Sequence, residues 1–291
     1  MSAKPSANFS ANLHALGAIF LWASLAALGV ALQHVPPFLL TGVALLIGSL
    51  LALPAVLRNP QVWRIPASTL LMGVYGLFGF HFLLFIALRH APAVEANLVN
   101  YLWPLLIVVM APLFLPGLRL RAVHVLAALL GFGGAAVAIL GSRSGDSAAG
   151  GWYWGYLPAM ASAFIWSSYS LMTRRVAAFP TTAIGLFGLV SGLLSLLCHA
   201  LMEPATALSA QDMGLLAVMG LGPLGAAFFL WDKALKLGDA RQIGILSYLT
   251  PLGSTALLMV VSGRSFSWSI GLAALMIVGA AVLGTLSKSP D

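Results

Sequence analysis

Long apolar runs separated by short polar connectors cover almost the whole chain. Ten of the runs are about 20 residues long, the length at which an α-helix crosses roughly 30 Å of hydrocarbon. The connectors hold most of the proline, glycine and charge. We therefore predict an all-α integral membrane protein with ten transmembrane helices and no soluble domain. The predicted spans are residues 13–33, 38–57, 68–88, 93–115, 122–141, 153–173, 181–202, 212–235, 240–262 and 267–287.

Composition agrees with this assignment. The chain is 60% hydrophobic and only 7% charged, whereas a soluble domain averages about 25% charged residues. The net charge of +7 would hint at nucleic acid in a soluble protein, but here we attribute it to cations at span ends. The single cysteine, Cys198, gives no disulfide framework and no cysteine-based metal site. We expect no cofactor, no metal and no nucleic-acid partner, and we see no cleavage site of a signal peptide.

The cationic residues predict the orientation in the membrane. If the N-terminus is cytoplasmic, 11 of the 14 Lys and Arg residues lie at cytoplasmic ends and 3 lie outside, as the positive-inside rule requires. We therefore predict a multi-pass protein of the bacterial inner membrane with both termini in the cytoplasm. The cytoplasmic set is Lys4, Arg58, Arg64, Arg119, Arg121, Arg174, Arg175, Lys233, Lys236, Arg241 and Lys288, and the outer set is Arg89, Arg143 and Arg264.

The two halves of the chain resemble each other. The segment "ALRHAPAVEANLVNYLWPL" begins at Ala87, and "ALKLGDARQIGILSYLTPL" begins 147 residues later at Ala234. An apolar run with a tryptophan also recurs, around Trp22 and Trp166. We infer a five-helix repeat over residues 1–145 and a second over 146–291. Because five is odd, the second repeat is inverted relative to the first, as in secondary transporters whose site lies between the halves.

These motifs also carry a family resemblance. The five-plus-five plan, the tryptophans of the first and sixth spans, and the "AL-basic…A…YL.P" pattern resemble the drug/metabolite transporter superfamily with EamA-type repeats. The resemblance covers nearly the whole chain. The shorter motifs "VNYLWP", "AFIWSSY" and "SYLTP" are similar to those of the aromatic amino acid exporters of the YddG type. The resemblance implies a transporter that exports aromatic amino acids.

Polar and aromatic positions inside the spans predict the binding site. In "EANLVNYLWP", residues 95–104, the two asparagines, the tyrosine and the proline share an arc of about 100° on a helix. Similar arcs occur in the first, sixth and ninth spans, and such stripes face a bundle interior or a wet cavity. We predict one central cavity, to which the eighth span adds Phe228 or Phe229. The candidate substrate-binding residues are Trp22, His81, Asn97, Asn100, Tyr101, Trp103, Trp166, Tyr169, Ser247 and Tyr248.

Two prolines predict hinges and backbone acceptors. A proline cannot donate to the carbonyl four residues earlier, so Pro104 should free the carbonyl of Asn100 and Pro251 that of Ser247. A bare carbonyl at this depth needs protein, water or ligand as a partner. We expect these carbonyls to accept from a substrate ammonium and the prolines to act as gating hinges.

Structural explanations compete with each of these roles. Asparagines often tie membrane helices together, tryptophans often lie at the interface, and His81 could be a packing residue. Glu95 is expected to pair with Arg89 or to cap a helix rather than couple an ion. Asp232 and Lys236 are expected to form an end-of-helix pair of little energetic weight.

The favoured function is export or facilitated diffusion of amino acids, preferably aromatic ones, by alternating access through the central cavity. The alternative is a broad exporter of drugs or metabolites, with or without proton coupling. Anionic cargo would require Lys or Arg in mid-span, and none is seen. HExxH, paired buried aspartates and GxxxxGK[ST] are absent, which argues against a membrane enzyme and an ATPase. Since no carboxylate is clearly buried, we prefer facilitated diffusion to proton coupling. We expect small-molecule substrates and the lipid bilayer as partners. We expect a monomer or a homodimer.

Overall fold

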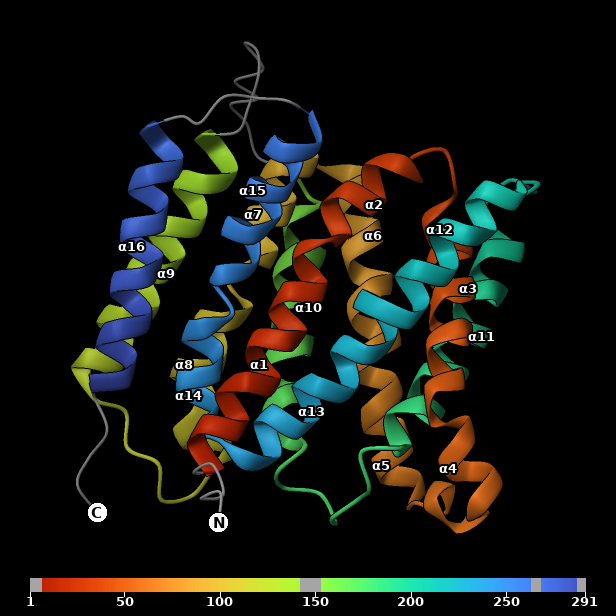
Figure 1. Cartoon of the computed structure of the whole chain (residues 1–291), viewed down its shortest axis with the longest axis horizontal. Helices are drawn as coiled ribbons and strands as arrows, with labels where there is room; N and C mark the ends of the chain where they lie inside the picture. The colour runs from red at the N-terminus through yellow and green to blue at the C-terminus, as the bar shows by residue number, and fades with distance from the viewer. Residues whose placement is uncertain (1–6, 142–152, 263–267, 287–291) are drawn as a thin grey trace, which may run out of the picture.

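The described part of the chain is built from helices. The computed structural model describes residues 7–141, 153–262 and 268–286, and it contains no strand in these ranges. Lys4, Arg143, Arg264 and Lys288, which entered the predicted orientation, lie outside them. Figure 1 shows the helices. In chain order they are α1 Ala7–Ala23, α2 Leu25–Ala31, α3 Pro37–Ser49, η1 Leu50–Ala52, α4 Leu53–Arg58, η2 Pro60–Trp63, α5 Ala67–Val74, η3 Tyr75–Gly79, α6 Phe80–His90, α7 Ala93–Asn100, α8 Trp103–Phe114, α9 Ala122–Gly141, α10 Tyr156–Met172, α11 Ala183–Met202, α12 Ala210–Leu221, η4 Gly222–Ala226, α13 Ala227–Leu237, α14 Ala240–Leu246, α15 Leu249–Ser262 and α16 Trp268–Leu286.

Helices occupy every one of the ten predicted ranges. Seven helical stretches in the described residues are long and apolar enough to cross a membrane. The helix α10, with 17 residues, falls short of that length, and neither α14 with α15 nor α16 is among the seven, so the count of ten spans stays a prediction. The all-helical, membrane-spanning architecture is confirmed.

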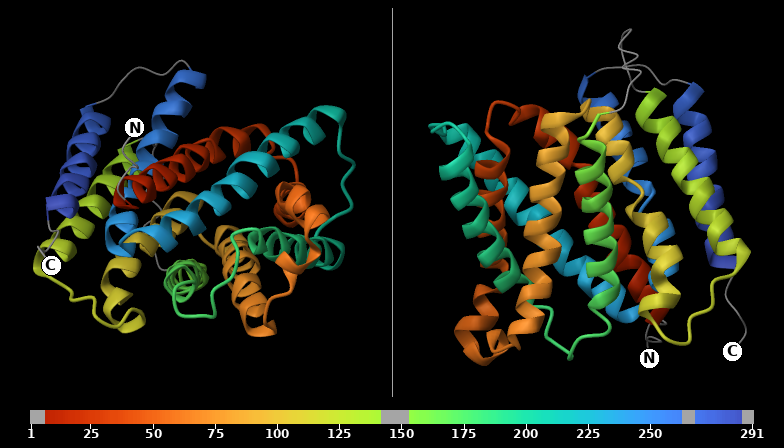
Figure 2. Two further views of the ribbon diagram at one scale, coloured as in Figure 1. Left: turned by 60° about the horizontal axis from the view of Figure 1, so that its bottom comes forward. Right: turned by 180° about the vertical axis from the view of Figure 1, so that it is seen from behind.

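The bundle has a pair of packed helices at each of two opposite edges and a third pair in the middle. The helices α9 and α16 pair along one edge, and α3 packs on α11 near the other. Between them α1 and α13 lie side by side, as the left view of Figure 2 shows. Aromatic residues of these central helices form the middle of the main core.

Local irregularities recur along the chain. A π-helical turn at Tyr75–Gly79 separates α5 from α6, and another at Gly222–Ala226 separates α12 from α13. The second turn lies 147 residues after the first, the offset at which the sequence motifs repeat. Since π-turns are rare, finding two of them at this offset indicates that the two halves share this local structure.

Both predicted proline positions coincide with breaks in a helix. The helix α7 ends at Asn100 and α8 begins at Trp103, with Pro104 in the first turn of α8. There its missing N–H costs nothing, since the first turn has no intrahelical acceptor. Likewise α14 ends at Leu246 and α15 starts shortly before Pro251. The breaks are present, and the hinge function stays a prediction.

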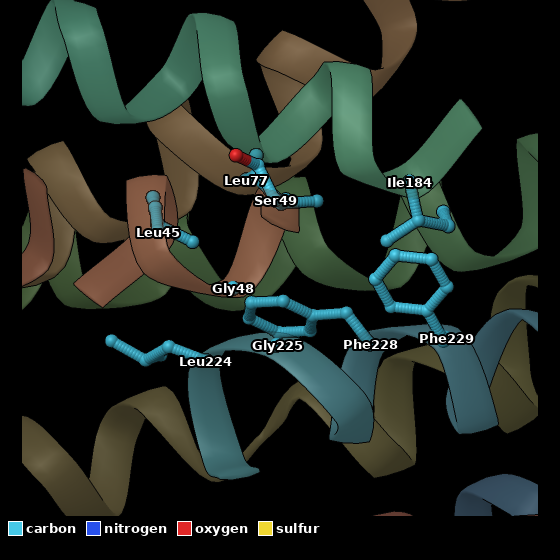
Figure 3. A pocket seen from close by; sticks show the side chains of 10 residues that line it. Leu45, Gly48, Ser49, Leu77, Ile184, Leu224, Gly225, Phe228 and Phe229 are labelled. Atoms are coloured by element: carbon cyan, nitrogen blue, oxygen red, sulfur yellow. The ribbon is translucent and has the colours of Figure 1, made fainter. Parts of the chain in front are cut away.

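Glycines let α3 approach the π-turn of η4 closely. A Cβ added at Gly48 would lie 2.7 Å from the carbonyl oxygen of Gly220 and 2.9 Å from Cα of Gly225. Figure 3 shows Gly48 above Gly225, with the ring of Phe228 beside them and the ring of Phe229 next to Ile184. The crevice there leaves no room for a water molecule. Through this contact α3 packs directly against the segment that positions Phe228 in the middle of the protein.

Candidate functional site

A cavity of about 740 Å³ opens in the bundle. This volume lies within the roughly 300–1,000 Å³ typical of small-molecule sites. Its lining runs from buried aromatic rings to the ends of α2 and α6 and the beginnings of α3 and α7. The cavity therefore opens on the face opposite the start of α1 (Figure 1). The lining residues are Trp22, Leu25, Ala26, Gly29, Val30, Leu32, Gln33, Val35, Pro37, Leu40, Phe80, His81, Leu84, Phe85, Leu88, Ala93, Asn97, Asn100, Tyr101, Trp103, Trp166, Met219, Leu224, Phe228, Thr250 and Ser254.

Aromatic rings close the deep end of the cavity, and we call them the aromatic floor: Trp22, Trp103, Trp166 and Phe228 line the cavity, and Trp231 packs behind them. The centroid of the Trp22 ring lies 5.8 Å from that of Trp166 and 5.2 Å from that of Trp231. Two indoles are fixed by hydrogen bonds: Trp22 Nε1 donates to the Pro223 carbonyl at 3.1 Å, and Trp231 Nε1 donates to Ser170 Oγ at 3.1 Å. Rings held in this way offer a rigid apolar surface for another ring.

The helix α7 supplies amides to one wall. Ser162 Oγ donates to Asn100 Oδ1 at 2.8 Å, so the Asn100 amide ties α10 to α7 and leaves Nδ2 free to donate. Asn97 and Tyr101 line the same wall. In the turn after Asn100, the N–H of Tyr101 donates to the Asn97 carbonyl and that of Leu102 donates to the Val99 carbonyl. The bare carbonyl of Asn100 stays a prediction.

The second predicted bare carbonyl is not found. The amide N–H of Thr250 donates to the carbonyl of Ser247 at 3.0 Å. A tightened turn at the break between α14 and α15 supplies this donor in place of the one that Pro251 lacks. The prediction of an open acceptor at Ser247 was wrong, because the turn after α14 closes with a bond between residues three apart.

His81 is buried on α6 at the side of the cavity, with 7% of its surface exposed. Its Nδ1 lies 2.6 Å from the carbonyl oxygen of Leu77. A carbonyl can only accept, so Nδ1 carries the proton and the neutral ring presents Nε2 as an acceptor. The rings of Phe80, Phe85 and Phe228 surround it. The hydrogen bond to Leu77 thus determines what the imidazole can offer to a ligand.

The structure gathers some of the predicted binding residues around the cavity and places others elsewhere. Those that line it are Trp22, His81, Asn97, Asn100, Tyr101, Trp103 and Trp166. Tyr169, Ser247 and Tyr248 are not in the lining. The ring of Tyr169 packs over Gly76, that of Tyr248 packs over Gly131 of α9, and Ser247 Oγ donates to the Gly244 carbonyl at 2.6 Å.

The polar arc predicted for the ninth span does not line the cavity, because the helix is broken within it. An arc counted at 100° per residue assumes one continuous helix, but α14 stops at Leu246. Beyond the break, α15 turns Thr250 and Ser254 toward the cavity. Thr250 stands 147 residues after Trp103, so the repeat offset could have identified it.

The expectation that no carboxylate is buried was wrong. Asp232 is 1% exposed, and the side chain of Glu203 is fully buried. Asp232 Oδ2 lies 2.7 Å from Lys236 Nζ, and Glu203 Oε1 lies 2.6 Å from Arg89 Nη2. In the Asp232–Lys236 pair the carboxylate is buried, while the Lys236 side chain is 27% exposed; Arg89 pairs with Glu203. Neither acid lines the cavity.

Comparison with known proteins agrees with this geometry. The model of the EamA-like transporter family matches residues 9–140 and again residues 153–286. The chain is 43% identical over 281 residues to the aromatic amino acid exporter YddG of Ancylobacter novellus, covering 95% of this chain and 97% of that protein. The protein of the same name from Salmonella typhimurium is 29% identical over 92% of this chain and 94% of its own. A protein of known crystal structure with 42% sequence identity matches 95% of this chain and 98% of its own with a TM-score of 0.87. The chain therefore belongs to the EamA-like transporter family and is a transporter, not an enzyme.

Proposed function

We propose that the protein is an inner-membrane carrier that exports amino acids, preferably aromatic ones, or lets them diffuse across. One observation carries the proposal: the cavity ends on the aromatic floor and has amides and an imidazole above it. The names of the relatives, which are aromatic amino acid exporters, support the same substrate class.

The hydrogen-bonding groups around the cavity match the two ends of a zwitterion. The acceptor that suits an ammonium is Nε2 of His81. The donors are the amides of Asn97 and Asn100 and the hydroxyl of Tyr101, which suit a carboxylate. An aromatic side chain would then lie on the indoles of the floor.

The lining also argues against charged cargo. Among the described lining residues there is no Asp, Glu, Lys or Arg. Sugar phosphates or organic cations would bring a net charge into a site without a counter-charge, which is unfavourable at membrane depth. A zwitterion has no net charge and needs only the dipoles present. The same absence of a carboxylate favours facilitated diffusion over proton coupling.

The proposed carrier has ten spans in two inverted repeats, residues 1–145 and 146–291. The double match of the family model and the two π-turns 147 residues apart support the repeat. With both termini in the cytoplasm, the cavity is open to the outside and the aromatic floor closes the inner side. Alternating access then requires the halves to exchange conformations, with bending at the breaks beside Pro104 and Pro251.

Counterflow in proteoliposomes tests this function. Vesicles loaded with unlabelled phenylalanine should accumulate labelled phenylalanine with saturation, and tryptophan should compete better than threonine. An imposed pH gradient should have little effect on the initial rate. Saturable flux of lipophilic drugs without flux of amino acids would support the broad exporter instead. A strong drive by the pH gradient would show proton coupling.

A further inference from the structure

A cluster of charged and polar groups lies just below the aromatic floor, on the side where α1 begins. It contains Asp232 and Lys236 of α13 together with Phe179 and Thr181 from the segment between α10 and α11. Lys236 Nζ lies 2.7 Å from Asp232 Oδ2 and donates to the Phe179 carbonyl at 2.9 Å. Thr181 Oγ1 donates to the same Asp232 oxygen at 2.6 Å. The ammonium also lies 3.9 Å from the centroid of the Phe179 ring.

This cluster is one of several bonds across a single seam. Trp231, the neighbour of Asp232, donates to Ser170 of α10. Farther along, Arg174 Nη1 donates to the carbonyl of Gly238, directly after α13, at 3.0 Å. All of these bonds join α13 to α10 or to the segment that follows it. The seam that they close lies between the cavity and the face opposite to its mouth.

The pairing of Asp232 is strong but incomplete. Its Oδ2 has two donors, while its Oδ1 is buried and has no hydrogen-bond partner. A buried carboxylate with one unpartnered oxygen is uncommon in a structure optimised only for stability. A contact that must separate in each transport cycle would instead use an ion pair that is strong in the closed state. Such a pair would leave one of its hydrogen-bonding atoms without a partner.

We propose that Asp232 and Lys236 form the inner gate lock of the carrier. The lock holds α13 against the segment that follows α10 while the cavity is open on the opposite face. It separates when the cavity opens on the side where α1 begins. This inference rests on the alternating access of the proposed function, and it assigns to named residues the contact that has to break.

The sequence repeat gives Lys236, but not Asp232, a counterpart at the other face. Lys236 stands 147 residues after Arg89, as the third residue of the repeated Ala-Leu-basic motif. The guanidinium of Arg89 lies 5.5 Å from the centroid of the Phe38 ring, at the start of α3, and binds Glu203. Thus α6 and α13, which end on opposite faces of the bundle (Figure 1), each end in a cation that lies over an aromatic ring and binds a buried acid.

Thiol labelling from each side tests the lock without any substrate. In a Cys198→Ser background, Ser170→Cys places a reporter in the seam and Ala93→Cys places one at the mouth of the cavity. Lys236→Met should raise labelling of the seam reporter severalfold and lower labelling of the mouth reporter. Lys233→Met is the matched control: Lys233 is an exposed cation on the same helix, and its loss should change neither rate.

A double variant separates the lock from folding. Asp232→Asn with Lys236→Met removes both charges, so no buried charge is left unpaired, yet the lock is still absent. It should keep the melting temperature near that of the parent and show the same reciprocal change in labelling. If labelling at both positions stays at parental rates in this variant, or rises at both, the pair is only structural and the proposal is overturned. Reciprocal labelling in a protein that transports no amino acid would refute the proposed function and leave the lock standing.

Discussion

The tautomer of His81 makes a specific prediction about substrate binding. Since Nδ1 donates to the Leu77 carbonyl, only Nε2 is left for the ligand, and the neutral ring offers it as an acceptor. His81→Gln can place an amide oxygen near the position of Nε2, whereas His81→Asn reaches only to the position of Nδ1. A hydrogen bond to a charged group contributes about 1.5–3 kcal/mol. Loss of the acceptor should therefore raise the KM for phenylalanine roughly 10- to 150-fold.

The assay is concentration-dependent counterflow of phenylalanine into proteoliposomes with equal amounts of folded carrier. His81→Gln should stay within a few-fold of the parent, while His81→Asn and His81→Leu should both show the raised KM. An uncharged competitor that lacks the amino group, 3-phenylpropionamide, should bind parent and His81→Leu alike. If His81→Asn transports like the parent and His81→Gln does not, the bond to Leu77 is what matters, and Nε2 does not contact the substrate.

Three further predictions follow from the site, the helix packing and a loop. Trp166→Ala should weaken phenylalanine transport several-fold and threonine transport less, because a lost ring contact costs about 0.5–1.5 kcal/mol beyond area; Trp268→Ala, at an 84% exposed position, is the control, and equal losses for both substrates would make the ring structural. Gly131→Ala should lower the melting temperature, since its Cβ would lie 2.4 Å from the Tyr248 ring, whereas Gly214→Ala, with nothing within 4 Å, should not. Burial acts to raise the pKa of Asp239, but hydrogen bonds and charge from Arg241 outweigh it and hold the pKa below its usual value. The pair should therefore stabilise the fold above about pH 4 and lose this effect as the pH falls further, and Asp239→Asn should melt with a weaker dependence on acid pH.

The sequence predicted the helices and seven of the residues that line the cavity, because apolar runs and polar arcs follow from periodic patterns. Apolar runs are set by the thickness of the bilayer, so all ten predicted ranges are helical. A polar arc predicts a cavity wall where the helix is continuous, as it is from Asn97 to Asn100. The motif offset of 147 residues also matches the spacing of the two π-turns, which no local pattern would have placed.

Prediction was weaker where a helix breaks or where distant segments meet. The break after Leu246 turns Tyr248 toward α9, and a helical count cannot include such a turn. Asp232 is held by Thr181, and Glu203 is held by the start of α3. In the sequence, both acids stand near the ends of apolar runs, where solvent exposure is the normal expectation. Long-range packing alone decides that they are buried.

Glu203 provides a test of how much the end of the bundle at the cavity mouth depends on one buried acid. Its Oε1 and Oε2 accept from the backbone N–H groups of Phe38 and Leu39 at 3.1 and 3.2 Å, and Arg89 and His199 lie at 2.6 and 3.0 Å. The carboxylate therefore caps α3 and joins it to α6 and α11. Removal of one partner from a buried ion pair costs about 3–5 kcal/mol, so Glu203→Ala should strongly lower the melting temperature. Glu203→Gln keeps an acceptor for α3 but leaves Arg89 unpaired, and Arg89 is about one-third exposed (34%), so water should compensate it and the loss should be smaller. If both variants melt like the parent, the contacts of Glu203 do not hold these three helices together.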